Sequence, residues 1–269
     1  IGVFLLVLAA ALMHATWNAL VKTGRDRMVD LTVVIVGAGL IAACFIPFVG
    51  LPDAASWPWM LGSIVTHIGY YIFLLAAYRH GALSRVYPIA RGSAPLLVAI
   101  GAIPLAGEVP DLAGAMGLGL VTLGILALAI ERGNMRGDQG RSVLFALLTG
   151  CCIVGYVLSD GMGVRASGNA AAYIAWTFAL ESIPMAIWCI HARRHALIAY
   201  LRFDGLRGMF GAVIAGGGYA IAIWAMSLAP LAQVTALRET SVVFGAIIGA
   251  VILKESFGPK RIAAAILVA

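Results

Sequence analysis

The sequence predicts an all-α integral membrane protein with ten transmembrane helices, arranged as two inverted five-helix repeats. Apolar residues make up 62% of the 269 residues and charged residues 11%, and the mean hydropathy is +1.00. A soluble domain is roughly 45–50% apolar and about 25% charged. The apolar runs are close to the ~20 residues that an α-helix needs to cross a bilayer. Little chain is left for an extramembrane domain, so the functional residues are expected among the helices.

Apolar runs separated by glycine, proline or charged residues give the expected helices. A tenth run begins near residue 259, and because it is too short to span a bilayer we expect it to continue past residue 269. The other nine spans are 2–21, 29–49, 58–78, 83–106, 111–130, 142–160, 170–191, 206–227 and 231–253.

The basic residues are distributed unevenly over the loops between these helices. Of the 18 Lys and Arg residues, 15 lie in odd-numbered loops, and Arg91 and Arg238 lie inside helices. By the positive-inside rule the odd-numbered loops face the cytoplasm and both termini face the outer, periplasmic side of a bacterial inner membrane. The net charge of +6 therefore reports loop orientation, and no nucleic-acid partner is expected.

An internal repeat appears when the second half is laid on the first. At an offset of 147 residues, Arg91 aligns with Arg238 and Glu108 with Glu255. Five is an odd number of helices, so the second unit must enter the membrane inverted, and matching loops should differ in charge. The loop at 22–28 is basic, whereas its counterpart at 161–169 holds one arginine. We expect a first repeat at 1–131, a cytoplasmic linker at 132–141 and a second, inverted repeat at 142–269.

In each unit the fourth helix ends with a stretch of mostly small or apolar residues and a glutamate, at Gly107-Glu108 and Lys254-Glu255. With the inverted 5+5 layout, these endings resemble the drug/metabolite transporter superfamily and its ten-helix EamA-like exporters. The intramembrane Tyr and Trp residues are similar to those of bacterial exporters of amino acids, including aromatic ones. This resemblance implies transport without catalysis, by alternating access of the two repeats around a central cavity, with small amphiphilic and zwitterionic substrates.

Polar and aromatic residues fall on single helix faces, at spacings of three and four residues. Such side chains cost free energy against lipid, so they should face the bundle interior or a cavity. Tyr78 also suits an interfacial belt, as do Tyr173 and Trp188. The expected substrate-binding residues are Trp17, Asn18, His67, Tyr70, Tyr71, Tyr78, Arg91, Tyr156, Trp176, Tyr219 and Arg238.

The two intramembrane arginines give the sharpest signal, because each costs about 2.5–3.5 kcal/mol on insertion scales. Either Arg91 or Arg238 could bind a substrate carboxylate. Alternatively, each could pair with Glu181 or Glu239, and for Glu239 a partner on another helix is expected because adjacent residues point about 100° apart. Glu181 or Glu239 could also carry a coupling proton. Pro88, Gly92 and Pro95 predict a kinked or unwound helix beside Arg91.

Other functions find less support in the sequence. An exchanger of phosphorylated metabolites would need several converging basic residues, and an exporter of cationic drugs is a further alternative. An intramembrane enzyme would need a catalytic motif, and the sequence contains no GxSxG-like serine motif, no HExxH and no pair of intramembrane aspartates. Asp160 is expected to stand alone at a helix end. No selectivity-filter segment predicts a channel. No cofactor is expected. His191 and His195 have the spacing of a metal-binding pair, but no metal site is expected because Arg193 and Arg194 between them would repel a cation. The oligomeric state is left open, and the expected partners are a small-molecule substrate and the lipid bilayer.

Overall fold

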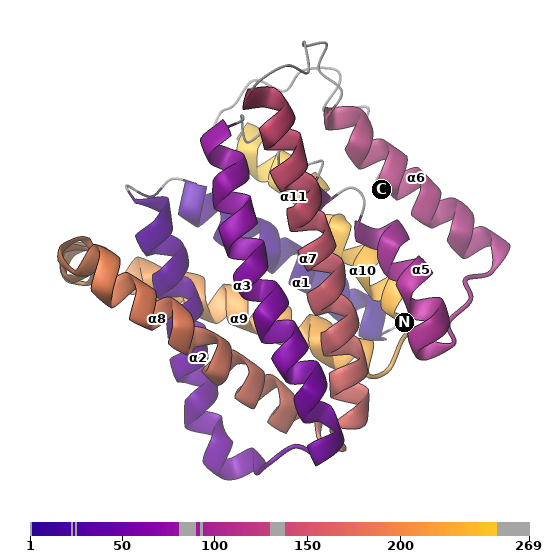
Figure 1. Ribbon diagram of the computed structural model, residues 1–269, viewed down its shortest axis with the longest axis horizontal. Coiled ribbons are helices and arrows are strands. Elements are labelled where there is room, and N and C mark those ends of the chain that lie inside the picture. Colours follow the sequence, from indigo (N-terminus) through magenta and orange to yellow (C-terminus); the bar gives the residue numbers. More distant parts are fainter. Residues whose placement is uncertain are drawn as a thin grey trace.

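The computed structural model describes residues 2–22, 24, 26–80, 90–91, 94–129 and 138–251, and Figure 1 shows their arrangement as a bundle of helices. Within these residues every regular element is helical. The helices are α1 (Gly2–Lys22), α2 (Arg27–Val49), the 3₁₀ turn η1 (Ala54–Ser56), α3 (Trp57–His80), α5 (Ala94–Ala106), α6 (Leu112–Ala129), α7 (Asp138–Ala166), α8 (Ala170–Phe203), α9 (Gly205–Met226), α10 (Leu231–Glu239) and α11 (Ser241–Val251).

Helix ends follow local sequence signals. The Asp26 side chain accepts hydrogen bonds from the backbone N–H groups of Met28 and Val29 and so caps the start of α2. Gly50 ends the same helix with φ of 74°, a conformation that favours glycine. Asn169 caps α8 through the N–H of Ala172. These caps satisfy backbone groups that have no partner within the helix.

The described helices have the length and composition of a multi-pass membrane protein. Six of them are long and apolar enough to cross a bilayer, namely α1, α2, α3, α7, α8 and α9, while α5 and α6 carry shorter apolar segments. Large apolar side chains remain exposed on the outside of the bundle, among them Leu40 at 62% and Ile72 at 58%. In a bilayer this surface faces lipid, and the polar side chains are turned inward.

Several expected boundaries differ from the structure. Helix α7 runs from Asp138 to Ala166, so it starts inside the expected linker at 132–141 and ends six residues after the expected span 142–160. Helix α8 continues to Phe203 through a bend at Arg193, so the expected loop after residue 191 is helical. Thr240 interrupts the expected span 231–253, dividing it into α10 and α11.

Some expectations fall outside the described residues. These are the predicted kink at Pro88 and Gly92, the second glutamate motif at Glu255, and the tenth helix near residue 259. The linker residues up to 137 also lie outside them.

Helices of the first half pack against helices of the second half. Helix α3 lies along α7, α2 lies along α8 and α9, and α1 lies along α9 (Figure 1). Helix α5 contacts α7 and α10, whereas α6 lies at the edge of the bundle (Figure 1). The centre of the bundle is therefore bounded by helices from both halves.

Small residues make this close packing possible. Gly39 on α2 faces α8, where a Cβ atom would lie 2.3 Å from the Cβ of Ser182 and 2.8 Å from the backbone oxygen of Phe178. At the contact of α3 with α7, Gly69 faces the sulfur of Cys152 and Gly155 faces Thr66. Between helices in lipid, such small residues let the backbones approach.

Replacing Gly39 with alanine should destabilise the α2–α8 contact, because the added methyl group meets backbone that cannot move aside. We expect a loss of about 1–3 kcal/mol in the free energy of unfolding, measured by denaturant unfolding of the purified protein in detergent. Gly117→Ala is the matched control, since a Cβ there meets nothing within 4 Å. Equal stability of the two variants would contradict close packing at Gly39.

Candidate functional site

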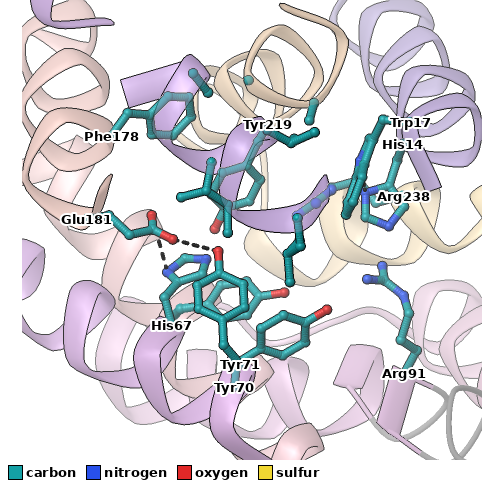
Figure 2. Close-up of a pocket in the computed structure, with 17 residues that line it drawn as sticks. His14, Trp17, His67, Tyr70, Tyr71, Arg91, Phe178, Glu181, Tyr219 and Arg238 are labelled. Atoms are coloured by element: carbon teal, nitrogen blue, oxygen red, sulfur yellow. Dashed lines mark hydrogen bonds and ion pairs between the residues drawn. The ribbon is translucent and has the colours of Figure 1, made fainter. Parts of the chain in front are cut away.

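A pocket of about 120 Å³ lies among helices of both halves (Figure 2). In this measure of volume a single water needs about 10–15 Å³, so the pocket holds several waters or a small organic group. Its walls combine aromatic rings with a few charged groups. The residues expected from the sequence that line it are Trp17, His67, Tyr70, Tyr71, Arg91, Tyr156, Glu181, Tyr219 and Arg238.

Helical periodicity explains how these residues meet. On α1, His14 and Trp17 are three residues apart, and the Trp17 Nε1 atom lies 3.3 Å from His14 Nδ1. On α8, Phe178 and Glu181 share a face in the same way, and both line the pocket. Helix α3 contributes His67 and, three and four residues later, Tyr70 and Tyr71. Neither His14 nor Phe178 is among the expected substrate-binding residues, although their spacings of three residues from Trp17 and from Glu181 were usable signals.

The aromatic rings form one continuous wall. The His67 ring stacks on Tyr156 with ring centres 3.9 Å apart, and Tyr70 meets Tyr156 edge to face at 5.9 Å. On the opposite side, Tyr219 stacks on Phe178 at 5.9 Å. Such a wall offers apolar faces to a bound molecule and hydroxyl groups at its rim.

Arg91 forms a buried ion pair across the bundle. Its Nη2 and Nε atoms donate to the two carboxylate oxygens of Glu239, at 2.6 and 3.1 Å. The side chains of Arg91 and Glu239 are 6% and 1% exposed. Arg91 was expected either to bind a substrate carboxylate or to pair with an acid, and the structure contains the ion pair. As expected, the partner of Glu239 lies in a distant segment of the chain and not beside it. Glu239 does not line the pocket.

Arg238 has a different environment. Its guanidinium carbon lies 4.8 Å from the centre of the Tyr219 ring, a cation–π contact. The residue is 7% exposed and lines the pocket, and no carboxylate lies within ion-pair distance of it among the described residues. Figure 2 shows the Arg238 side chain extending between Tyr219 and the Trp17–His14 pair. The two intramembrane arginines therefore differ, because among the described residues Arg91 is neutralised by a fixed acid and Arg238 is not.

Glu181 lies on the other side of the pocket (Figure 2). Its carboxylate accepts a hydrogen bond of 2.8 Å from the Tyr71 hydroxyl, and its second oxygen lies 3.9 Å from His67 Nδ1. Within the described ranges, neither lysine nor arginine pairs with it. The pocket thus has a cationic side at Arg238 and an acidic side at Glu181.

Asp160 was misjudged from the sequence. Because α7 continues to Ala166, Asp160 lies within the helix and is fully buried, contrary to the expectation of an isolated residue at a helix end. Its carboxylate accepts hydrogen bonds from the hydroxyl groups of Tyr173 and Tyr219. Asp160 therefore supports Tyr219, which forms part of the pocket wall.

Other expected residues lie elsewhere. The Trp176 indole donates to the backbone oxygen of Gly50 at 2.9 Å and packs against Trp57, away from the pocket. The Asn18 amide donates to the backbone oxygen of His14, so Asn18 does not reach the pocket. The Tyr78 side chain falls outside the described residues. Among those described, no group of three His, Cys, Asp or Glu side chains is placed to hold a metal ion.

Comparison with known proteins finds a family that the second half of the chain resembles. Residues 140–269 match the EamA-like transporter family. The second half of the chain is thus similar to EamA-like transporters. This match agrees with the resemblance to the drug/metabolite transporter superfamily drawn from the glutamate motifs. An EamA protein is a membrane transporter of small molecules, and the family is not enzymatic.

Solved structures show a likeness in fold over nearly the whole chain. One crystal structure superposes with a TM-score of 0.74, covering 99% of this chain and 93% of that chain at 15% sequence identity. At this identity the comparison shows a shared fold. No curated protein matches the sequence.

The Arg91–Glu239 pair should be energetically coupled. Arg91→Met alone leaves a buried carboxylate without its cation, and we expect it to cost about 3–5 kcal/mol in the free energy of unfolding. The double variant Arg91→Met, Glu239→Leu removes both charges and should recover most of that loss. Denaturant unfolding of the two single variants and the double variant gives the coupling energy. Additive losses would show that the pair contributes no coupling.

Proposed function

We propose that this EamA-like protein exports small amphiphilic metabolites, in particular amino acids including aromatic ones. The observation that carries the proposal is the Arg238 guanidinium, which faces an aromatic pocket with no acid paired to it in the described chain. A guanidinium in a buried site favours an anionic partner, and its planar fork suits a carboxylate. The substrate carboxylate then binds at Arg238.

The remaining pocket walls suit the rest of an amino acid. Aromatic or aliphatic side chains can pack on the faces of Tyr70, Tyr156 and Phe178, which line the pocket. On the acidic side, Glu181 and the tyrosine hydroxyls offer acceptors for an ammonium group. A molecule with both charges and an apolar body therefore fits the pocket better than a purely apolar one.

Transport occurs by alternating access of two inverted five-helix repeats. The pairing of α1 with α9, α2 with α8 and α3 with α7 supports this mechanism, because the pocket is bounded by helices from both halves of the chain. A rocking of one repeat against the other changes the pocket walls without breaking either repeat. The odd-numbered basic loops face the cytoplasm of a bacterial cell and both termini face the periplasm.

The alternatives are less well supported by the pocket. A phosphorylated substrate needs several cations, but Glu239 already neutralises Arg91. A cationic drug would find Glu181, but it would meet the charge of Arg238 as well.

Arg238→Gln should lower the efflux of phenylalanine from proteoliposomes by roughly 10- to 100-fold in kcat/KM, since a hydrogen bond to a charged group is worth about 1.5–3 kcal/mol. Arg194→Gln, which removes the same charge from an exposed position, should retain wild-type efflux. A second comparison uses phenethylamine, which lacks the carboxylate. Arg238→Gln should not lower its transport. Equal loss for both substrates would contradict a carboxylate site at Arg238.

A further inference from the structure

Four buried polar side chains, Ser63, His67, Asp160 and Glu181, form a cluster beside the pocket that we call the acid–imidazole cluster. His67 Nδ1 lies 3.3 Å from the Ser63 hydroxyl and 3.9 Å from the Glu181 carboxylate. The Ser63 hydroxyl in turn interacts with the Asp160 carboxylate. His67 Nδ1 is thus the shared neighbour of a path that runs from Asp160, which is fully buried, to Glu181, which lines the pocket.

Asp160 and Glu181 differ from three acids of the chain that form ion pairs with arginine. Glu239 is paired with Arg91, Glu108 with Arg165, and Asp26 with Arg193. Asp160 and Glu181 have no lysine or arginine partner among the residues that the structure describes. Their neighbouring donors are tyrosine hydroxyls and, for Asp160, also the Ser63 hydroxyl. A buried carboxylate that no fixed cation neutralises can have its charge balanced by a proton.

The imidazole of His67 can hold and pass that proton. Nδ1 lies 3.1 Å from the backbone oxygen of Ser63, and a carbonyl oxygen only accepts, so Nδ1 carries a hydrogen. That hydrogen points toward the Ser63 backbone oxygen, and the same nitrogen lies 3.9 Å from the Glu181 carboxylate. A small rotation of the Glu181 side chain, or one water, would close the 3.9 Å gap.

The surrounding charges also link the cluster to the pocket. Arg238 acts electrostatically on His67 and contacts Tyr219, whose hydroxyl donates to Asp160. The titratable and charged groups that face the cluster are His14 on α1, Tyr70 and Tyr71 on α3, Arg91 with its partner Glu239, Tyr156 on α7, Tyr173 on α8, Tyr219 on α9 and Arg238 on α10. Helix α2 presents apolar side chains to the pocket.

We propose that the acid–imidazole cluster is a proton-binding site that drives export by proton–substrate exchange. The proposal rests on the substrate site described above. An ammonium group that enters beside Glu181 balances the same charge as a proton, so substrate binding releases the proton and proton binding releases the substrate. Because Ser63 and His67 lie on α3 while Asp160 and Glu181 lie on α7 and α8, the proton count also alters a contact between the two halves.

The test uses the full protein in liposomes that are one pH unit more acidic inside, with the membrane potential clamped by potassium and valinomycin. Exchange of one proton should accumulate external phenylalanine inside by up to about tenfold, because one pH unit is a tenfold difference in proton activity. Glu181→Gln should abolish the accumulation, and because the same carboxylate binds the ammonium group in the proposed site, any entry of phenylalanine that remains should be slower and should stop at equilibrium. Asp111→Asn, which converts an exposed acid at the start of α6, should accumulate it as the wild type does.

Counterflow without a pH gradient separates this inference from the proposed function. Counterflow by the wild type without accumulation would overturn proton coupling and leave the carrier intact, whereas absence of counterflow would contradict amino-acid transport itself. A measurement without substrate decides the proton site in either case. Infrared difference spectra between two pH values should contain a carboxylic acid band that is lost in Glu181→Gln and kept in Asp111→Asn. An unchanged band in Glu181→Gln would overturn the proposal.

Discussion

The ion pair between Arg91 and Glu239 joins the two halves of the chain inside the membrane. Lipid offers no water to solvate either charge, so each group needs the other, and the helices that carry them must stay close. Glu239 directly follows Arg238 on α10, so the Arg91–Glu239 pair also fixes the position of Arg238 relative to the pocket. Arg238 then enters the pocket with its charge unmatched by a fixed acid in the described structure. The cationic side of the pocket therefore follows from the pairing of Glu239 with Arg91, which leaves Arg238 to face the pocket.

Close packing of the helices supplies the second requirement. Glycines at the α2–α8 and α3–α7 contacts let the backbones approach, and this brings His67, Asp160 and Glu181 from three helices into one cluster. Helices α3, α7 and α8 come from different halves, so the pocket and the cluster share the interface along which the halves would move. Substrate binding, proton binding and motion can therefore influence one another through the same contacts.

Much of the fold and part of the site followed from the sequence. Apolar runs marked the six described helices that are long enough to cross a bilayer, and helical spacing predicted that Trp17, Tyr71 and Glu181 face an interior site. The errors have physical causes. Helix α8 continues past His191 because a helix can extend beyond the apolar layer, where hydropathy no longer marks it, and the longer α7 put Asp160 inside a helix. Trp176 was expected at the pocket from its helix face, but its indole donates a hydrogen bond to the Gly50 backbone oxygen. Helical periodicity does not predict such a partner in a loop. The choice of Arg91 as the partner of Glu239 likewise depends on contacts between distant segments.

The most direct test of the central claim is equilibrium binding of radiolabelled phenylalanine to the purified protein, compared with an Ala215→Trp variant. Ala215 lines the pocket, and an indole there would fill much of its roughly 120 Å³ while every charged residue of the pocket is retained. The account predicts saturable binding to the wild type and none to the filled variant, provided that both melt at similar temperatures in detergent. Undiminished binding to the folded Ala215→Trp variant would contradict this pocket as the substrate site.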